Sequence, residues 1–268
     1  MVADEAGRIV LMPVISIITP VHPAGAAYLP TAYQSLARQE IPPGWTWEWI
    51  IQEDGEAGHA QAHLPIDSRI RVASSRHGGP HVARTVALGR SSGDLIKTFD
   101  SDDVMADGAL RRDIGVLTEH RDVGWTTSRV LDLHSDGRLS GFDGDPPAGR
   151  IPRGSIFPYW EQTRRAQVHP ATMCARRHLI MALGGWMALP SSGDTGLLLG
   201  LDALADGWFT AEVGLHYRKH QGQITAHSAH SSGPEWEARM SVIAEHARAV
   251  RLLLGDEAGR SGERAASR

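Results

Sequence analysis

The feature of this sequence best suited to chemistry is a run of carboxylates. Asp100-Ser101-Asp102-Asp103 directly follows an apolar segment, residues 95–99. Such a cluster repels itself unless a cation or hydrogen-bond donors compensate its charge. Hard divalent cations accept oxygen ligands and usually keep substrate phosphates in their coordination shell. The run is therefore either a metal and phosphate site or a solvated acidic turn in which Asp103 caps a following helix.

A second acidic pair, Glu53-Asp54, follows another apolar segment, residues 47–51. Short apolar segments of this kind predict buried strands. In open α/β sheets, ligands bind in the crevice outside the carboxyl ends of the strands. Both acidic groups are therefore expected at one functional edge of a sheet.

The elements that would position these carboxylates alternate between strand and helix patterns. Apolar runs predict strands, and apolar spacings of three and four predict helices. This alternation predicts a parallel sheet covered by helices on both faces. In the first hundred residues, strands are expected at 14–18, 47–51, 70–72 and 95–99, and helices at 28–38 and 82–88.

The second half of the chain is less regular. The Gly- and Pro-rich segment 141–154 is expected to be a mobile loop. An apolar stripe on the last helix favours packing against its own domain, because its three heptads barely suffice for a coiled coil. A homodimer through this helix is the alternative. Helices are expected at 107–120, 176–183, 194–205 and 235–254, and strands at 123–133 and 208–217.

Composition excludes several classes of protein. The 27 basic and 31 acidic residues leave a net charge of −4, which argues against a nucleic-acid binder. The single cysteine, Cys174, excludes an internal disulfide framework and a cysteine-clustered zinc site. No apolar run approaches the roughly 20 residues of a membrane span, and residues 1–11 lack a signal-peptide core. A cytoplasmic protein without an integral membrane segment is expected.

Several short motifs follow one another along residues 14–226, and the run ending at Asp103 belongs to the fourth of them. They are Ile15 to Pro20, Ile50 to Gly55, Arg76 to Ala87, Ser92 to Asp103, Arg176 to Trp186, and Tyr217-Arg-Lys-His220 with Thr225. In order and spacing they resemble glycosyltransferase family 2, whose DXD signature is matched by residues 100–102.

This resemblance implies a single GT-A-like α/β domain. The expected architecture is a Rossmann-like mixed sheet with helices on both faces and a C-terminal amphipathic helix. Residues 14–255 would form the domain, with a nucleotide-binding half at 14–103, an acceptor-binding half at 104–233 and the C-terminal helix at 234–255. Residues 1–13 would be an N-terminal extension and 256–268 a disordered tail.

The resemblance also implies a donor site. Asp54 would accept the ring N–H of uracil, and Arg84 and Arg76 would reach the nucleotide or diphosphate, since a guanidinium suits phosphate geometry. Arg76 is alternatively a plain surface residue. Mn²⁺ or Mg²⁺ would be held mainly by Asp102, with help from Asp100 and His220. The other nucleotide-binding residues expected are Pro20, Val21, His22, Asp100 and Ser101.

On the acceptor side, Asp194 stands where the family places its catalytic base, at a helix start after a Gly-Gly-aromatic segment. An acid is common just before the base, where this chain has Gly193, and an arginine often stands where it has Gly200. Asp194 is alternatively a helix cap. Trp186 and His169 are the expected acceptor-binding residues, although a structural role for His169 is the simpler alternative.

The function implied is a metal-dependent, inverting hexosyltransferase that moves one sugar from a nucleotide-sugar, preferably a UDP-sugar, to the hydroxyl of a small-molecule or lipid-linked acceptor. The Gln-x-x-Arg-Trp motif of processive synthases is missing after Asp194. A nucleotidyltransferase is one alternative. Such an enzyme would need a glycine loop rich in Lys or Arg after the first strand, and residues 21–25 have no Lys or Arg. A non-catalytic nucleotide-sugar-binding module, suggested by Gly193 and Gly200, is the other.

Overall fold

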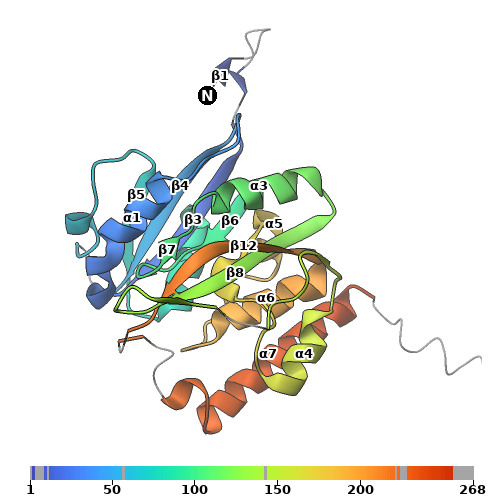
Figure 1. Ribbon diagram of the computed structural model, residues 1–268. Helices are drawn as coiled ribbons and strands as arrows, with labels where there is room; N and C mark the ends of the chain where they lie inside the picture. Colours follow the sequence, from blue (N-terminus) through green and yellow to red (C-terminus); the bar gives the residue numbers. More distant parts are fainter. Residues whose placement is uncertain are drawn as a thin grey trace, which may run out of the picture.

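A computed structural model describes residues 2–3, 9–10, 12–55, 58–141, 144–220, 222–223 and 228–255. Most of its strands join one sheet, which helices cover on both sides (Figure 1). The strands of this sheet are β3 (Val14–Val21), β4 (Thr46–Asp54), β5 (Ile70–Ser75), β6 (Leu95–Thr98), β7 (Val104–Met105), β8 (Val123–Leu133), β9 (Leu139–Ser140), β10 (Gly149–Ile151), β11 (Cys174–Arg176) and β12 (Asp206–Arg218). The α-helices are α1 (Leu29–Ala37), α2 (Pro80–Arg90), α3 (Ala109–Glu119), α4 (Ile156–Thr163), α5 (Arg177–Ala182), α6 (Gly193–Leu204) and α7 (Pro234–Leu253).

The sheet is mixed. Its main strand order is β10-β12-β8-β11-β6-β3-β4-β5, with β7 paired to β12 and β9 to β8. Strands β6, β3, β4 and β5 run parallel to one another. The short strand β11 is antiparallel to both β6 and β8, so it joins the parallel half to the rest of the sheet. The predicted mixed α/β sheet is confirmed.

The two faces of the sheet are covered by different helices because side chains alternate along each strand. On β3, Ile15 and Ile17 pack in a core with residues of α1 and α3. Ile18 lies in the other core, with residues of α2, α4, α5, α6 and α7. Trp49 of β4 is fully buried, and its Nε1 donates to Thr19 Oγ1 over 2.8 Å. Trp49 is therefore a core residue.

A buried polar network ties the two halves of the sheet together. Lys97 of β6 is 2% exposed, and its Nζ donates to Asp113 Oδ2 of α3 and to the carbonyl of Thr172, both over 2.6 Å. Asp113 Oδ1 accepts from Thr126 Oγ1 of β8 over 2.6 Å. A buried charge needs such a complete set of partners. The proposed division of the domain after residue 103 therefore lies within one continuous sheet, and stays a prediction.

The segment expected to be a mobile loop, 141–154, differs from that expectation. Its last residues include β10, which pairs antiparallel with β12 and places Ile151 in the core. The following helix α4 was not predicted from the sequence. Its first N–H groups, those of Ile156 and Phe157, donate to the buried carboxylate of Asp202 on α6 over 3.3 and 3.2 Å. Residues 142–143 of the predicted loop lie outside the described part of the chain.

Helix α7 packs on α6 within the same chain (Figure 1). Met240, Ile243, Ala247 and Val250 of its apolar stripe are buried, as expected for packing against its own domain. Val242 and Leu252 to Leu254 are exposed on the same helix and its end. A homodimer through α7 would have to use exposed side chains of this kind, and stays a prediction.

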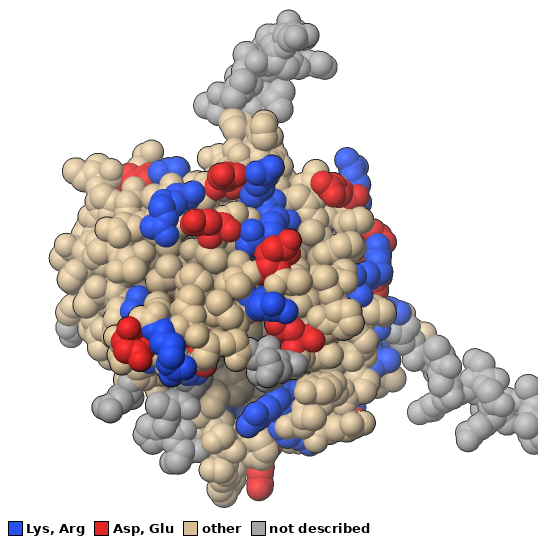
Figure 2. Space-filling model, viewed as in Figure 1, with Lys and Arg blue, Asp and Glu red and all other residues tan. Residues whose placement is uncertain are grey.

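At the N-terminus, β1 (Val2–Ala3) pairs antiparallel with β2 (Ile9–Val10). The tail expected at 256–268 and Thr225 of the last family motif lie outside the described residues. Across the described part of the chain, the helices lack the combination of length and hydropathy that a membrane span requires. On the face shown in Figure 2, basic and acidic side chains are interspersed.

Candidate active site

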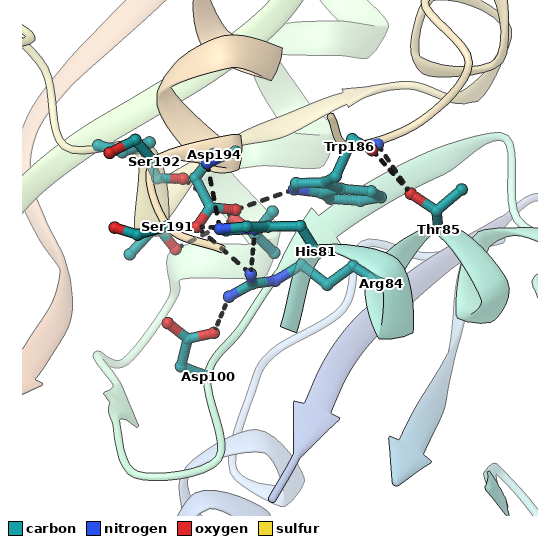
Figure 3. Close-up of polar contacts among 12 residues, drawn as sticks. His81, Arg84, Thr85, Asp100, Trp186, Ser191, Ser192 and Asp194 are labelled. Atoms are coloured by element: carbon teal, nitrogen blue, oxygen red, sulfur yellow. Dashed lines mark hydrogen bonds and ion pairs between the residues drawn. The ribbon is translucent and has the colours of Figure 1, made fainter. Parts of the chain in front are cut away.

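The candidate site lies where the carboxyl ends of β4 and β6 meet the first turns of α2 and α6 (Figure 3). Helix α2 begins at Pro80, directly after Gly79, whose φ of +89° is accessible to glycine. Proline suits a first helical position because the N–H that it lacks would have no partner within the helix there. This start places His81 and Arg84 three residues apart, on one face of α2. Both side chains point toward Asp194 on α6 (Figure 3).

Arg84 joins two carboxylates that are far apart in the sequence. Its side chain is 4% exposed, Nη1 donates to Asp194 Oδ2 over 3.3 Å, and Nη2 donates to Asp100 Oδ1. Burial alone would lower the pKa of Arg84, but Asp100 and Asp194 outweigh it and raise that pKa. The guanidinium is therefore a fixed cation between the acidic run after β6 and the start of α6.

Asp194 is held by side chains and not by the backbone of its own helix. Its Oδ1 accepts from Trp186 Nε1 over 2.9 Å, and its Oδ2 accepts from Arg84. Burial acts to raise the pKa of Asp194, but Arg84, His81 and the Trp186 hydrogen bond lower it overall. An ionised carboxylate with these partners can accept a proton, and its hydrogen bonds are not those of a helix cap.

The acidic run is not a solvated turn. Asp103 is 1% exposed, its Oδ1 accepts from the Arg218 N–H over 2.9 Å, and its Oδ2 is buried without a hydrogen-bond partner. Burial, together with Asp100 and Asp102, raises the pKa of Asp103 well above its ordinary value. Helix α3 begins only at Ala109, so Asp103 does not cap it.

The residues expected to hold a metal are brought together in part. Asp102 Oδ2 lies 2.8 Å from His220 Nε2, whereas the Asp100 carboxylate accepts from Arg84. Among the described residues, no group of three or more His, Cys, Asp or Glu side chains is arranged to hold a metal ion. A carboxylate oxygen such as that of Asp102 nevertheless suits Mn²⁺ or Mg²⁺, and Mg²⁺ is usually held by one or two carboxylates together with substrate phosphates.

At the expected nucleotide end, Asp54 anchors the loop before α2. Its Oδ1 accepts from the Gly78 N–H over 2.7 Å, its Oδ2 accepts from the Gly79 N–H over 3.0 Å, and His77 Nδ1 lies 3.0 Å from Oδ2. Arg76 in the same loop is exposed.

The remaining nucleotide-side residues surround the end of β3. Pro20 and Val21 are the last residues of that strand and are buried, while His22 is exposed and accepts from the Ala24 N–H over 3.4 Å. Ser101 is buried, and a Cβ on Gly25 would lie 2.8 Å from its Oγ. Their contacts with a nucleotide stay predictions.

The two residues expected to bind the acceptor have defined intramolecular contacts. Trp186 is 3% exposed, and its backbone N–H and C=O both bond to Thr85 Oγ1, over 3.0 and 3.2 Å. Its ring is therefore placed to position Asp194. His169 Nδ1 accepts from the Ala171 N–H over 3.3 Å, its ring lies 5.0 Å from that of Tyr217, and burial lowers its pKa to about 4. Acceptor binding by either residue stays a prediction.

Sequence reasoning missed two side chains at this site. His81 lies within the Arg76 to Ala87 motif, three residues before Arg84, but the family resemblance assigns it no role. Arg239 of α7 is 3% exposed, and its Nη1 donates to Ser192 Oγ, just before α6, over 2.9 Å. No local signal identifies Arg239, because its partner is distant in the sequence.

A mixed α/β sheet with carboxylates at its strand ends, facing an acidic residue at the start of a helix, is the arrangement expected for a GT-A glycosyltransferase. The family model "Glycosyl transferase family 2" matches residues 16–175, and the chain belongs to this family. The family and the GT-A fold expected from the sequence are both confirmed.

This chain aligns with parts of longer proteins. O-antigen biosynthesis protein RfbC of Myxococcus xanthus is 30% identical over 115 residues, which are 40% of this chain and 9% of that protein. Residues 1–349 of S. aureus TarS in complex with UDP-GlcNAc superpose with a TM-score of 0.68 at 18% identity, over 87% of this chain and 66% of that one. The same TarS fragment with UDP gives 0.64 at 16% identity, over 87% and 64%. The chain thus spans less than two thirds of each of these relatives.

Proposed function

We propose that the chain is a metal-dependent, inverting glycosyltransferase that transfers one sugar from a UDP-sugar to an acceptor hydroxyl. The observation that carries this proposal is the Asp100–Arg84–Asp194 chain, which links the acidic run after β6 to a carboxylate held ionised on α6. The complexes of TarS with UDP-GlcNAc and UDP support UDP as the nucleotide.

On the donor side, Asp102 and His220 would hold Mn²⁺ or Mg²⁺, with Asp100 close by. When bound, such a cation stabilises the negative charge that develops on the departing diphosphate. Arg84 supplies a second, fixed positive charge next to the same carboxylates. Asp54 holds the Gly78–Gly79 turn and is proposed to accept the uracil N–H, and Arg76 is free to turn toward the diphosphate.

On the acceptor side, Asp194 is proposed to act as the base. The acceptor oxygen attacks the anomeric carbon, the bond from that carbon to the diphosphate oxygen breaks, and the acceptor proton moves to a carboxylate oxygen of Asp194. A single displacement of this kind inverts the anomeric configuration. General bases contribute about 10²- to 10⁴-fold to such reactions.

The acceptor is proposed to be a small molecule or a lipid-linked glycan, bound near Trp186 and His169. RfbC is described as an O-antigen biosynthesis protein, which favours a glycan acceptor. The absence of the processive motif supports transfer of one sugar per encounter, and the net charge of −4 does not favour a nucleic-acid partner. A cytoplasmic location is part of the same proposal.

The experiment is an incubation of the protein with UDP-, GDP- and dTDP-sugars in the presence of Mn²⁺, with thermal shift and nucleotide release as readouts. A ligand at 100 times its dissociation constant stabilises by about 2.7 kcal/mol, which a thermal shift detects. The proposed function predicts a shift with UDP-sugars and slow release of UDP, with water as acceptor. A shift without release indicates a binding module. In a separate incubation with UTP and a sugar phosphate, release of pyrophosphate would indicate a nucleotidyltransferase.

A further inference from the structure

Gly193, the first residue of α6, lies against the imidazole ring of His81 on α2. A Cβ at position 193 would be 2.5 Å from His81 Cγ and 2.8 Å from the carbonyl oxygen of Met187. Real Cβ atoms do not approach other atoms so closely. Position 193 therefore excludes a side chain, including the acid that the family resemblance leads us to expect there.

His81 occupies that space and makes a hydrogen bond in it. Its Nε2 accepts from the Gly193 N–H over 3.1 Å. The first N–H groups of a helix need partners from outside the helix. The residue before α6, Ser192, makes no side-chain cap bond, and its Oγ instead accepts from Arg239. His81 thus caps, from a different helix, the turn that bears Asp194.

The same ring faces the carboxylate of Asp194. Both ring nitrogens face donors: the Gly193 N–H lies 3.1 Å from Nε2, and Arg84 Nη1 lies 3.2 Å from Nδ1. The cap on Gly193 needs a bare Nε2, which puts the proton of a neutral ring on Nδ1. This atom lies 3.8 Å from Asp194 Oδ2, next to Arg84 Nη1, which lies 3.3 Å from the same oxygen. His81 is 3% exposed and burial lowers its pKa to about 4, so the ring is neutral at pH 7. Arg84 Nη1 thus contacts both the His81 ring and Asp194 Oδ2, and Oδ1 is left to Trp186.

We propose that His81 is a positioning residue for Asp194, and that the His81–Gly193 pair takes the place of a second acid beside the base. This inference rests on the proposed function, in which Asp194 accepts the acceptor proton. It also gives Gly193 a role in an active enzyme, because the glycine makes room for the imidazole.

The test compares two replacements of the ring. His81→Phe keeps its shape but loses the acceptor, and His81→Gln offers an amide oxygen to the Gly193 N–H. A misplaced catalytic group costs on the order of 10²-fold, so Phe is expected to lower kcat for UDP-sugar hydrolysis by about that factor without changing the Kd for UDP with Mn²⁺. Gln is expected to restore most of kcat, and His178→Phe on the exposed surface of α5 is the control.

A purely structural role predicts equal losses for Phe and Gln, in proportion to lost folded protein, and would overturn the inference. Asp194→Asn distinguishes a failure of this inference from a failure of the proposed function. If Asp194→Asn is inactive while His81→Phe is as active as the wild type, the inference fails and the proposed function stands. If Asp194→Asn is active, the proposed function fails and the inference fails with it.

A second readout does not depend on activity. Long-range ¹H–¹⁵N NMR spectra of the histidine rings report which nitrogen carries the proton. A bare Nε2 and a protonated Nδ1 are expected for His81 at pH 7, with the signal assigned by its loss in His81→Gln. A proton on Nε2, or an imidazolium at that pH, would overturn the inference.

Discussion

Arg84 is the residue on which both carboxylates of the candidate site depend. Arg84→Met would leave Asp100 and Asp194 facing each other without their shared cation, and the pKa of Asp194 would rise. Breaking a buried ion pair costs about 3–5 kcal/mol, but these two side chains are 28% and 23% exposed, so a loss of about 2 kcal/mol is expected after solvent screening. Urea unfolding measures this loss.

The matched control is Arg90→Met at the end of the same helix, where the guanidinium bonds to Gln52 Oε1 over 2.8 Å. Arg84→Met is expected to lose UDP affinity and turnover as well as stability. Equal stability and equal UDP affinity for the two variants would contradict a central role for Arg84.

Asp102 is expected to make nucleotide binding depend on the metal. Asp102→Ala removes the carboxylate that lies 2.8 Å from His220 Nε2, and should abolish the increase in UDP affinity that Mn²⁺ produces. Titration calorimetry with and without Mn²⁺ measures that increase, and Asp136→Ala in an exposed turn serves as control. An Asp102→Ala variant that binds UDP as tightly as the wild type in saturating Mn²⁺ would rule out this assignment.

At the residue scale, motifs predicted the carboxylates but not their partners. Asp100, Asp102 and Asp194 were predicted because they stand in short local patterns. The bond from Arg84 to Asp194 and that from Gly193 to His81 join residues separated by 110 and 112 positions. Such contacts depend on how two helix starts meet in space, which no local pattern specifies.

At the scale of elements, α7 should stabilise the site by packing on α6. Ile243 is fully buried between these helices, whereas its neighbour Val242 is 43% exposed. Ile243→Ala is expected to cost about 2–5 kcal/mol, because it leaves a cavity, and Val242→Ala to cost less than about 1 kcal/mol. Chemical denaturation measures both. Similar costs for the two variants would mean that α7 is not docked in this way.

The contact between α6 and α4 should make stability depend on pH. Burial raises the pKa of Asp202 to about 6, although the N–H groups at the start of α4 oppose this. Because its folded pKa lies above the unfolded value, the stability that protonated Asp202 provides is complete below pH 4 and is lost as the pH rises through 6.

Asp202→Asn removes this ionisation. Relative to the wild type, the variant is expected to gain stability between pH 4 and pH 7 by up to about 3 kcal/mol, at 1.36 kcal/mol for each pKa unit. Urea unfolding at both values measures the difference, and the same difference at pH 4 and pH 7 would contradict the shift.

For the whole molecule, alternation along the chain was enough to predict the parallel half of the sheet, because β3, β4, β5 and β6 are apolar runs separated by helices or turns. Strands β10 and β11 have only three residues each, which is too few to show an alternating apolar pattern. They form through pairing with distant strands. Yet β11 joins the two halves of the sheet and so brings the acidic run and the base to one site. The motifs of the family resemblance, and not periodicity, predicted that the two halves form one domain.

Whether Asp194 removes the acceptor proton is tested most directly by comparing UDP release from a UDP-sugar by the wild type and by Asp194→Asn, with UDP binding and melting measured on both. Asn keeps the shape of the side chain and can still accept from Trp186, but it cannot take a proton. The variant is expected to bind UDP with Mn²⁺ like the wild type, to melt close to it, and to lose about 10²- to 10⁴-fold in turnover. Turnover near the wild-type rate in Asp194→Asn would contradict the assignment of Asp194 as the base.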